Sequence, residues 1–224
     1  MKRIVIIYVL LITVFVSYGV KPEDTRFCFV EKDGLLPLDD LNPHYDALSQ
    51  TDLTLRLVYD QQAGESVTTK YVAKAIFSVY TVQQSHDLHA ILKKHIFSLK
   101  VYGPLLKDMT QLIVFFTLEV ESDFRNHQGF GKKMLSSSLE YLREHYDGYP
   151  MIWAASPYSF IKKEAAQQDP SLKENAAGRY RKMSMDELCK LYTKHTNNEA
   201  KEVFRGPDEN GVEYAGFYML IKKQ

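Results

Sequence analysis

The segment FRNHQGFGKKML, residues 124–135, is the most informative part of the chain about its fold, because its two glycines join a very apolar run to an amphipathic stretch. Glycine at such a junction indicates that the backbone bends sharply or that another group approaches it closely. If a helix begins at these glycines, its first-turn amides have no intrahelical acceptor and can bind an anion. The segment therefore predicts a bend into a helix whose start can hold an anion.

The residues on either side predict a strand, a helix and a second strand. LIVFFTLEV, residues 112–120, is short and almost continuously apolar, as expected of a strand buried on both faces. PMIWAAS, residues 150–156, follows after a helix that ends at Asp147-Gly148. Strands joined by a helix lie parallel in one sheet, so the order predicts a parallel strand–helix–strand unit. The helix is indicated by apolar residues spaced four, three and four apart: Leu135, Leu139, Leu142 and Tyr146.

Two hairpins are predicted on either side of this unit. Alternation over residues 53–59 and a β-rich run over residues 71–82, with a turn at residues 61–64, predict the first. KEVFRG and VEYAGFYMLI, residues 201–206 and 212–221, flank a turn signal and predict the second.

Two further helices complete the predicted elements. One begins at Ser85, runs to Leu99 and is stopped by a Gly-Pro pair. The other begins with a capping box from Ser184 to Glu187. Its inward-facing residues are expected to be Leu188, Leu191 and Tyr192. Together the elements predict an α+β fold with a central mixed sheet.

The N-terminus predicts export. A charged start at Lys2 and Arg3 precedes a long apolar run and the small residues Ser17 and Gly19, which is the pattern of a secretory signal peptide. Residues 1–19 are therefore expected to be a signal peptide, and residues 20–224 a single domain. Two other interpretations stay open: an uncleaved membrane anchor, and a buried strand.

Charge, cysteines and histidines narrow the function classes. Lysine plus arginine equal aspartate plus glutamate at 28 each, so net charge predicts no nucleic-acid partner and no anionic membrane surface. Membrane contact is expected only through the N-terminal segment, if it stays uncleaved. Cys28 and Cys189 can form one bridge in an exported protein, which the sequence leaves undecided. His86 and His89 have no further ligand at a recognised spacing, so no metal site is predicted.

LEVESDFRNHQGFGKKML, residues 118–135, resembles the acetyl-coenzyme A signature of the GCN5-related N-acetyltransferase (GNAT) superfamily. That pattern is a strand, then Arg or Gln, two residues, Gly, one residue, and Gly or Ala at the head of a helix. The strand at residues 150–156, the helix with a tyrosine at Tyr192 and the strand at residues 212–221 resemble later elements of the same family. The resemblance covers roughly residues 50–224. It implies a mostly antiparallel sheet, flanked by helices, with acetyl-CoA bound at the parallel unit.

The glycine turn has a physical reason to hold the diphosphate of acetyl-CoA. Amides at a helix start point into one concavity, the two glycines have no side chains to block it, and Lys132 adds charge. The competing interpretation is that the glycines merely allow helix and strand to pack closely. The resemblance implies that Val120 donates its N–H to the thioester oxygen. It implies that the cofactor is also held by Asn126, His127, Gln128, Gly129, Phe130, Gly131 and Lys132.

Two departures from the family pattern stand in this region. Asn126 occupies the Arg/Gln position and Arg125 lies one place early, so the loop carries one extra residue. Residues 160–182 look inserted between the fifth strand and the Tyr192 helix, where they would border the acceptor groove and select substrate.

The resemblance implies direct transfer of an acetyl or acyl group to an amine, which needs a base, support for an oxyanion and an acid. Glu119 and Glu121 lie two apart on one face at the strand end, so either can be the base; the alternative is a solvated strand end. Tyr192 has the phenol needed for the acid; the alternative is a core tyrosine. The acceptor amine stays open among a small molecule, a peptide N-terminus and a protein lysine.

The predicted signal peptide implies export, whereas acetyl-CoA is a metabolite of the cytosol, so the two predictions conflict. One resolution is delivery by a microbe into another cell's cytoplasm, or action in a compartment supplied with the thioester. Another is an uncleaved anchor, although Lys2 and Arg3 favour leaving the domain outside. A third resolution is that the chain is an exported GNAT-like binding protein that has lost catalysis. This is the alternative functional hypothesis. Asn126 favours that hypothesis, whereas Tyr192 and the glycines oppose it.

Overall fold

The computed structural model describes twelve parts of the chain: residues 24–33, 48–63, 66–82, 102–103, 105–121, 124, 129–156, 158–159, 173–174, 180–181, 183–207 and 212–223. The predicted leader at residues 1–19 lies outside the described residues. So does the helix predicted from Ser85 to Leu99.

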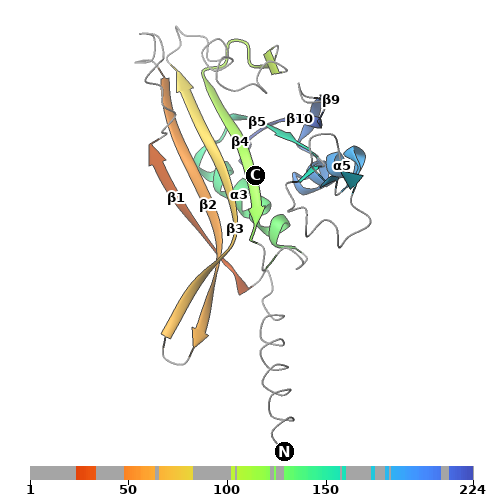
Figure 1. Ribbon diagram of the computed structural model, residues 1–224. Helices are drawn as coiled ribbons and strands as arrows, with labels where there is room; N and C mark the ends of the chain where they lie inside the picture. Colours follow the sequence, from red (N-terminus) through yellow and green to blue (C-terminus); the bar gives the residue numbers. More distant parts are fainter. Residues whose placement is uncertain are drawn as a thin grey trace, which may run out of the picture.

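Within the described residues, seven strands form one sheet in the order β1-β2-β3-β4-β5-β10-β9 (Figure 1). Neighbouring strands run antiparallel except β4 and β5, which are parallel. The predicted mixed sheet, both hairpins and the parallel unit are thereby confirmed, whereas β1 was not predicted. The strands are β1 (Arg26–Asp33), β2 (Leu48–Ala63), β3 (Ser66–Val82), β4 (Gln111–Val120), β5 (Pro150–Ala155), β9 (Lys201–Pro207) and β10 (Glu213–Leu220).

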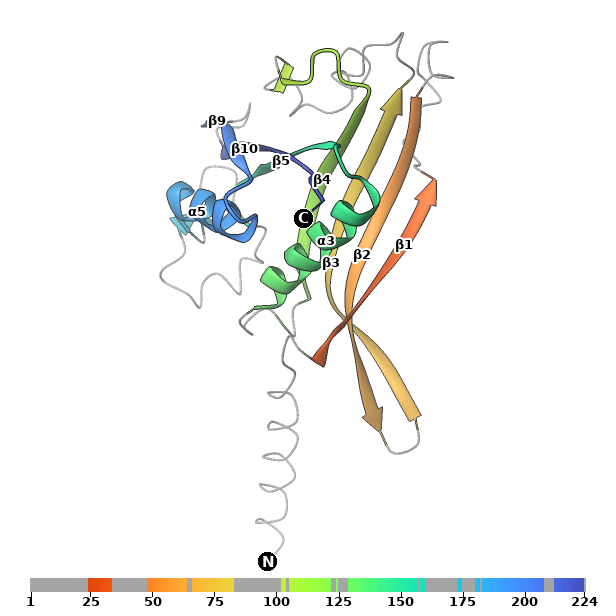
Figure 2. The same cartoon turned by 180° about the vertical axis from the view of Figure 1, so that it is seen from behind.

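Within the described part of the chain, two helices lie on the sheet. α3 (Phe130–His145) covers β2, β3 and β4 on the face that Figure 2 turns toward the viewer. It packs there because its buried stripe, which includes Met134, Leu139 and Leu142, meets alternate apolar residues of the strands. α5 (Met185–His195) packs on β10 and also touches α3.

The start of α5 confirms the predicted capping box. The Ser184 Oγ accepts from the Glu187 N–H at 3.1 Å, and the Glu187 carboxylate accepts from the Ser184 N–H at 2.7 Å. The expected inward face is partly wrong: Leu188 is buried, but Leu191 is 38% exposed. Helix spacing places Leu188 and Leu191 on the same face of α5. The sheet covers only the part of this face that lies nearest β10.

β2 and β3 are longer than predicted and project beyond the sheet as a two-stranded ribbon (Figure 1). β1 pairs with β2 only over residues 51–58, and β4 pairs with β3 only over residues 73–81. The expected turn at residues 61–64 is wrong, because β2 continues to Ala63. A bulge at Val72 places that side chain beside Ala73 in the α3-side core and marks where the ribbon begins.

β4 is buried on both faces only in its first half, contrary to the prediction. Leu112 to Phe115 are buried, but Phe116 is 49% exposed and later residues are half-buried or exposed. The cause is a bulge: Ile76 faces Thr117 and Phe77 faces Phe115, which leaves Phe116 as the extra residue. β4 also pairs with β5 through only two residue pairs, Ile113 with Met151 and Val114 with Ile152. The second half of β4 is therefore not paired with β5.

A buried tyrosine joins β5 to β10 on the side of the sheet opposite α3. The Tyr102 hydroxyl donates to the Trp153 carbonyl at 2.5 Å and accepts from the Phe217 N–H at 3.0 Å. Gly216 makes room for it, since a Cβ at Gly216 would lie 2.7 Å from that hydroxyl oxygen. Burial raises the pKa of Tyr102 well above its ordinary value.

A small second sheet has one strand just before the region that looked inserted and two strands inside it. β6 (Tyr158–Ser159), β8 (Tyr180–Arg181) and β7 (Lys173–Glu174) pair antiparallel in that order. Among the helices that the structure describes, none combines the length and apolar character needed to cross a membrane.

Candidate functional site

The glycine turn ends in a helix start of the predicted kind. Gly129 has φ 103°, a left-handed conformation that favours glycine. The first intrahelical bond runs from the Lys133 N–H to the Gly129 carbonyl at 2.8 Å, so the N–H groups of Gly131 and Lys132 precede it without an intrahelical acceptor. Among the described residues no side chain caps this end, and the first turn contains no acidic residue. The start of α3 is electrostatically suited to an anion.

Packing alone does not explain Gly131. A Cβ at this position would lie 3.6 Å from Leu118 Cδ2 and 3.7 Å from Val120 Cγ2, which are ordinary contact distances. An alanine would therefore fit between helix and strand. The close-packing interpretation predicts a clash here, and the structure has none.

Both ends of the turn are held, although its middle lies outside the described residues. The Phe124 N–H donates to the Glu121 carbonyl at 2.9 Å, and the Phe124 ring meets the Phe130 ring edge-on at 5.6 Å. Phe130 is fully buried, so it anchors the head of α3 rather than presenting its side chain to a ligand. The other expected cofactor residues, Asn126, His127 and Gln128, fall outside the described part.

The two lysines of the first turn differ. The Lys133 Nζ donates to the Thr25 carbonyl at 2.8 Å, whereas Lys132 is exposed. His195, at the end of α5, lies close enough to Lys132 to respond to it. Burial lowers the pKa of His195 below its ordinary value of 6.5, and the charges of Lys132 and Lys194 lower that pKa further. The end of α5 thus meets the start of α3.

The candidate bases lie together on the face opposite α3, as the spacing predicted. Leu118 and Val120 pack into the α3-side core, so Glu119 and Glu121 alternate to the other face. Glu119 is paired with Lys74 of β3 at 3.0 Å. The Glu121 N–H donates to the Val72 carbonyl at 2.9 Å, and successive N–H groups of a strand alternate in direction. The Val120 N–H therefore points away from β3, toward the side of β5.

Tyr192 lies on the α3 side of the sheet. Its ring packs on Trp153 of β5 and Phe217 of β10, with centroids 5.6 Å and 5.1 Å away. Burial raises the pKa of Tyr192 to about 12, so the phenol keeps its proton at neutral pH. Among the described residues nothing hydrogen-bonds its hydroxyl, and no polar contact joins it to Glu119 or Glu121. The neighbouring Trp153 Nε1 is buried without a partner in the same part of the chain.

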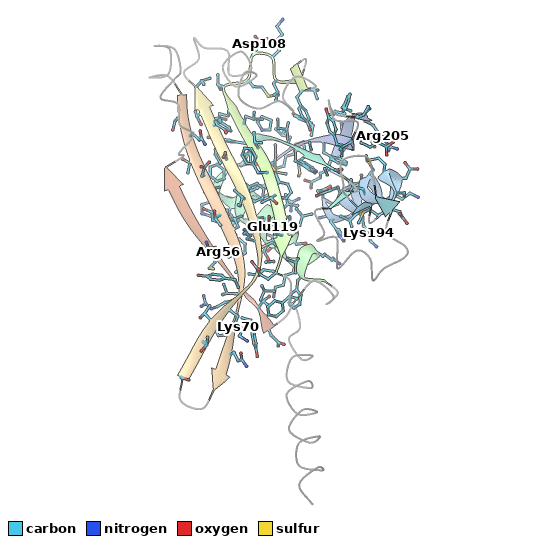
Figure 3. The ribbon with its side chains drawn as sticks, viewed as in Figure 1. Arg56, Lys70, Asp108, Glu119, Lys194 and Arg205 are labelled. Carbon is cyan, nitrogen blue, oxygen red and sulfur yellow. The ribbon has the colours of Figure 1, made fainter. Side chains whose placement is uncertain are left out.

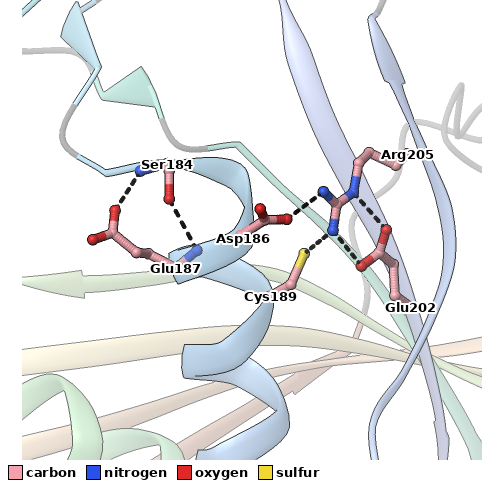
Figure 4. Close-up of polar contacts among 6 residues, drawn as sticks. All are labelled: Ser184, Asp186, Glu187, Cys189, Glu202 and Arg205. Atoms are coloured by element: carbon pink, nitrogen blue, oxygen red, sulfur yellow. Dashed lines mark hydrogen bonds and ion pairs between the residues drawn. The ribbon is translucent and has the colours of Figure 1, made fainter.

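A polar cluster on the other side of α5 was not foreseen from the sequence (Figure 4). The Arg205 guanidinium binds Glu202 through two bonds of 2.7 and 2.8 Å and Asp186 through one of 2.6 Å. It also donates to the Cys189 Sγ at 3.5 Å. Burial, followed by a hydrogen bond to Glu202, raises the pKa of Cys189 to about 11. Only the packing of β9 against α5 brings these residues together.

Both cysteines are free thiols, which answers the question that the sequence left open. Cys28 lies on β1 and Cys189 on α5. In the described part of the chain, no three His, Cys, Asp or Glu side chains gather into a metal site.

Comparisons with known proteins add likenesses to solved structures only, with ten chains matching. No protein-family model matches the chain, and no curated protein matches it. A solved structure described as the NatC complex bound to Gag peptide and CoA is similar at 13% identity and a TM-score of 0.37. The match covers 75% of this chain and 71% of that one. A likeness at this identity and TM-score assigns neither a family nor an activity.

Proposed function

We propose that this chain is an acyl-coenzyme A dependent N-acyltransferase of the GNAT type, with acetyl-CoA as co-substrate and an amine as acceptor. The proposal rests chiefly on the turn between β4 and α3. There a left-handed Gly129 precedes an uncapped helix start, next to the half of β4 that has left β5. A diphosphate matches amides that point into one concavity beside a lysine.

The turn residues are proposed to hold the cofactor together. The N–H groups of Gly131 and Lys132 would bind its phosphate oxygens, and the Lys132 side chain would add charge. Phe130 would act indirectly, since its ring is fully buried. Asn126, His127 and Gln128 are proposed members of the same cradle. Acetyl-CoA supplies an acyl group activated as a thioester.

The acid and the base are proposed on separate elements. Tyr192 is the proton donor, because its phenol stays protonated at neutral pH and no described residue forms a hydrogen bond with its hydroxyl. Glu121 is favoured over Glu119 as the base, because the Glu119 carboxylate is already paired with Lys74. Val120 is proposed to direct its N–H to the thioester oxygen, since that N–H points away from β3. The base and the acid serve different atoms, so they need not touch each other.

Calorimetric titration of the purified protein with acetyl-CoA tests this function. We expect saturable binding to one site, with desulfo-CoA competing, because the proposed contacts involve the diphosphate rather than sulfur. Absence of binding would contradict the proposal and favour the second hypothesis, an exported GNAT-like protein without catalysis.

Export through residues 1–19 remains part of the proposal, with secretion favoured over a membrane anchor. Mass spectrometry of the intact protein from its native source tests it. A mature chain that starts near Val20 would support cleavage, and a chain that starts at Met1 would contradict it.

A further inference from the structure

A small hollow lies on the sheet face opposite α3, where β4 ends and the β2–β3 ribbon begins. Its volume is about 150 Å³. Figure 3 shows Arg56 on β2 and Glu119 on β4 on either side of β3 at this level of the sheet. The residues that line the hollow are Arg56, Tyr71, Ala73, Lys74 and Glu121.

The charged side chains around the hollow differ in whether they form ion pairs. Lys74 is neutralised by Glu119 at 3.0 Å. The Glu121 carboxylate has no ion pair among the described residues, and neither has the Arg56 guanidinium. Arg56 instead lies over the Tyr71 ring, 4.7 Å from its centroid, which fixes its direction. Among the described residues, the hollow therefore offers one carboxylate and one guanidinium without an ion-pair partner, and with Glu119 included the charges at the hollow sum to zero.

Glu121 lines the hollow and is also the last described residue at the end of β4 before the chain turns toward α3. The Glu121 N–H is fixed to Val72 of the ribbon base at 2.9 Å, and its carbonyl accepts from Phe124 at 2.9 Å. A ligand beside the Glu121 carboxylate would therefore lie at the strand end from which the chain leads to the helix start that we assign to the cofactor.

We propose that this hollow binds the acceptor, and that the acceptor is a free α-amino acid. This inference rests on the proposed function. A small zwitterion matches the site: its carboxylate would pair with Arg56 in a fork-like contact, and its ammonium group with Glu121. The volume suits a ligand of amino-acid size rather than a protein segment.

The transfer balances with the groups present. Glu121 accepts the proton that the ammonium group must lose, and the amine nitrogen then bonds to the thioester carbonyl carbon. As the carbon–sulfur bond breaks, Tyr192 gives its proton to the leaving sulfur. The attacking nitrogen loses its second proton to water and water restores the Tyr192 proton, while Glu121 releases its proton to solvent. The products are an N-acyl amino acid, the free thiol and one proton.

The decisive measurement compares each free L-α-amino acid with its own C-terminal amide and its decarboxylated amine, using acetyl-CoA and the purified protein. Mass spectrometry of the products gives kcat/KM for each acceptor. We expect at least one amino acid to exceed its amide and its amine by roughly ten- to a hundredfold, because only the acid pairs with Arg56. This comparison needs no variant, so a folding defect cannot obscure it.

Arg56→Gln should remove that preference by raising KM for the amino acid, with little change for its amide. The matched control is Lys70→Gln, which also removes one positive charge from the ribbon region but lies outside the hollow. It should keep the preference.

The outcomes separate the two proposals. If acetyl-CoA binds but amides are acylated as well as acids, or peptide amines exceed free amino acids, the acceptor assignment is wrong and the cofactor site stands. If acetyl-CoA binds and none of the panel is acylated, the assignment is also wrong. If acetyl-CoA does not bind, the proposed function itself fails.

Discussion

The Lys133 ammonium group donates a hydrogen bond of 2.8 Å to the main-chain carbonyl of Thr25, which joins the first turn of α3 to the residue preceding β1. The two residues are 108 positions apart. Thr25 is buried, so this contact holds the entry to β1 against the helix. Lys132 is then the lysine of this turn whose side chain faces solvent.

The conformation of Gly129 makes it the most direct test of the cofactor site. We expect Gly129→Ala to abolish detectable acetyl-CoA binding in calorimetry and to lower the free energy of unfolding by about 1–3 kcal/mol, because φ 103° is strained for alanine. Gly148→Ala is the matched control, since Gly148 also has positive φ, at 81°, with open space around it. It should lose similar stability and still bind acetyl-CoA. Equal affinity in both variants would count against the cradle.

Tyr192→Phe tests the proposed acid. The ring contacts with Trp153 and Phe217 should survive, so stability and acetyl-CoA affinity should hold while kcat falls by roughly a hundredfold. Because the pKa of Tyr192 is about 12, its ionisation should not appear in the rate profile of the wild type below about pH 10. An unimpaired kcat would leave Tyr192 as a core residue only.

Tyr102 and Gly216 should act as a unit in stability. Tyr102→Phe leaves a buried carbonyl and a buried N–H unpaired and should cost about 1–3 kcal/mol in urea unfolding. Gly216→Ala should cost a similar amount through overpacking, about 1–3 kcal/mol, since its Cβ would lie 2.7 Å from the Tyr102 oxygen. The double variant removes that oxygen, so its cost should be less than the sum of the two. Additive costs would show that the clash is relieved in another way.

His195 should report the contact between α5 and α3. An NMR titration is expected to give a His195 pKa below 6.5, and Lys132→Gln should raise it, because burial and the Lys132 charge both disfavour the imidazolium. The unfolded state then binds more protons between the two pKa values. The contribution of His195 to the free energy of unfolding is therefore complete above pH 6.5. It is lost as pH falls from 6.5 through the lower pKa that His195 has in the folded state. No response to Lys132→Gln would mean that the two helix ends are apart in solution.

Local patterns were sufficient for several elements. The Ser184–Glu187 capping box, the helix stripe around Leu139 and the glycine turn were all predicted, and α5, α3 and the bend at Gly129 occur there. Each of these signals lies within one segment: a capping box spans four successive residues, and an amphipathic helix needs only its own periodicity. The parallel pairing of β4 with β5 followed because a strand–helix–strand connection allows little else.

Pairings between distant segments could not be predicted in this way. β1 has no distinctive pattern and is a strand only because β2 extends along it. The Glu119–Lys74 ion pair and the Arg56–Tyr71 contact depend on the register across three strands and on the bulges at Phe116 and Val72. Sequence spacing therefore made Glu119 and Glu121 equally good candidates for the base. The structure distinguishes them, because the Glu119 carboxylate is paired with Lys74.

Local signals along the chain were enough to specify the strand–turn–helix–strand unit and the residues available to it, because backbone conformation at Gly129 and helix periodicity are local properties. Among the described residues, contacts across the folded sheet set which charges at the end of β4 have an ion-pair partner. Cross-strand register and bulges select the neighbours of each side chain, and that selection requires partners more than forty residues away to be in place.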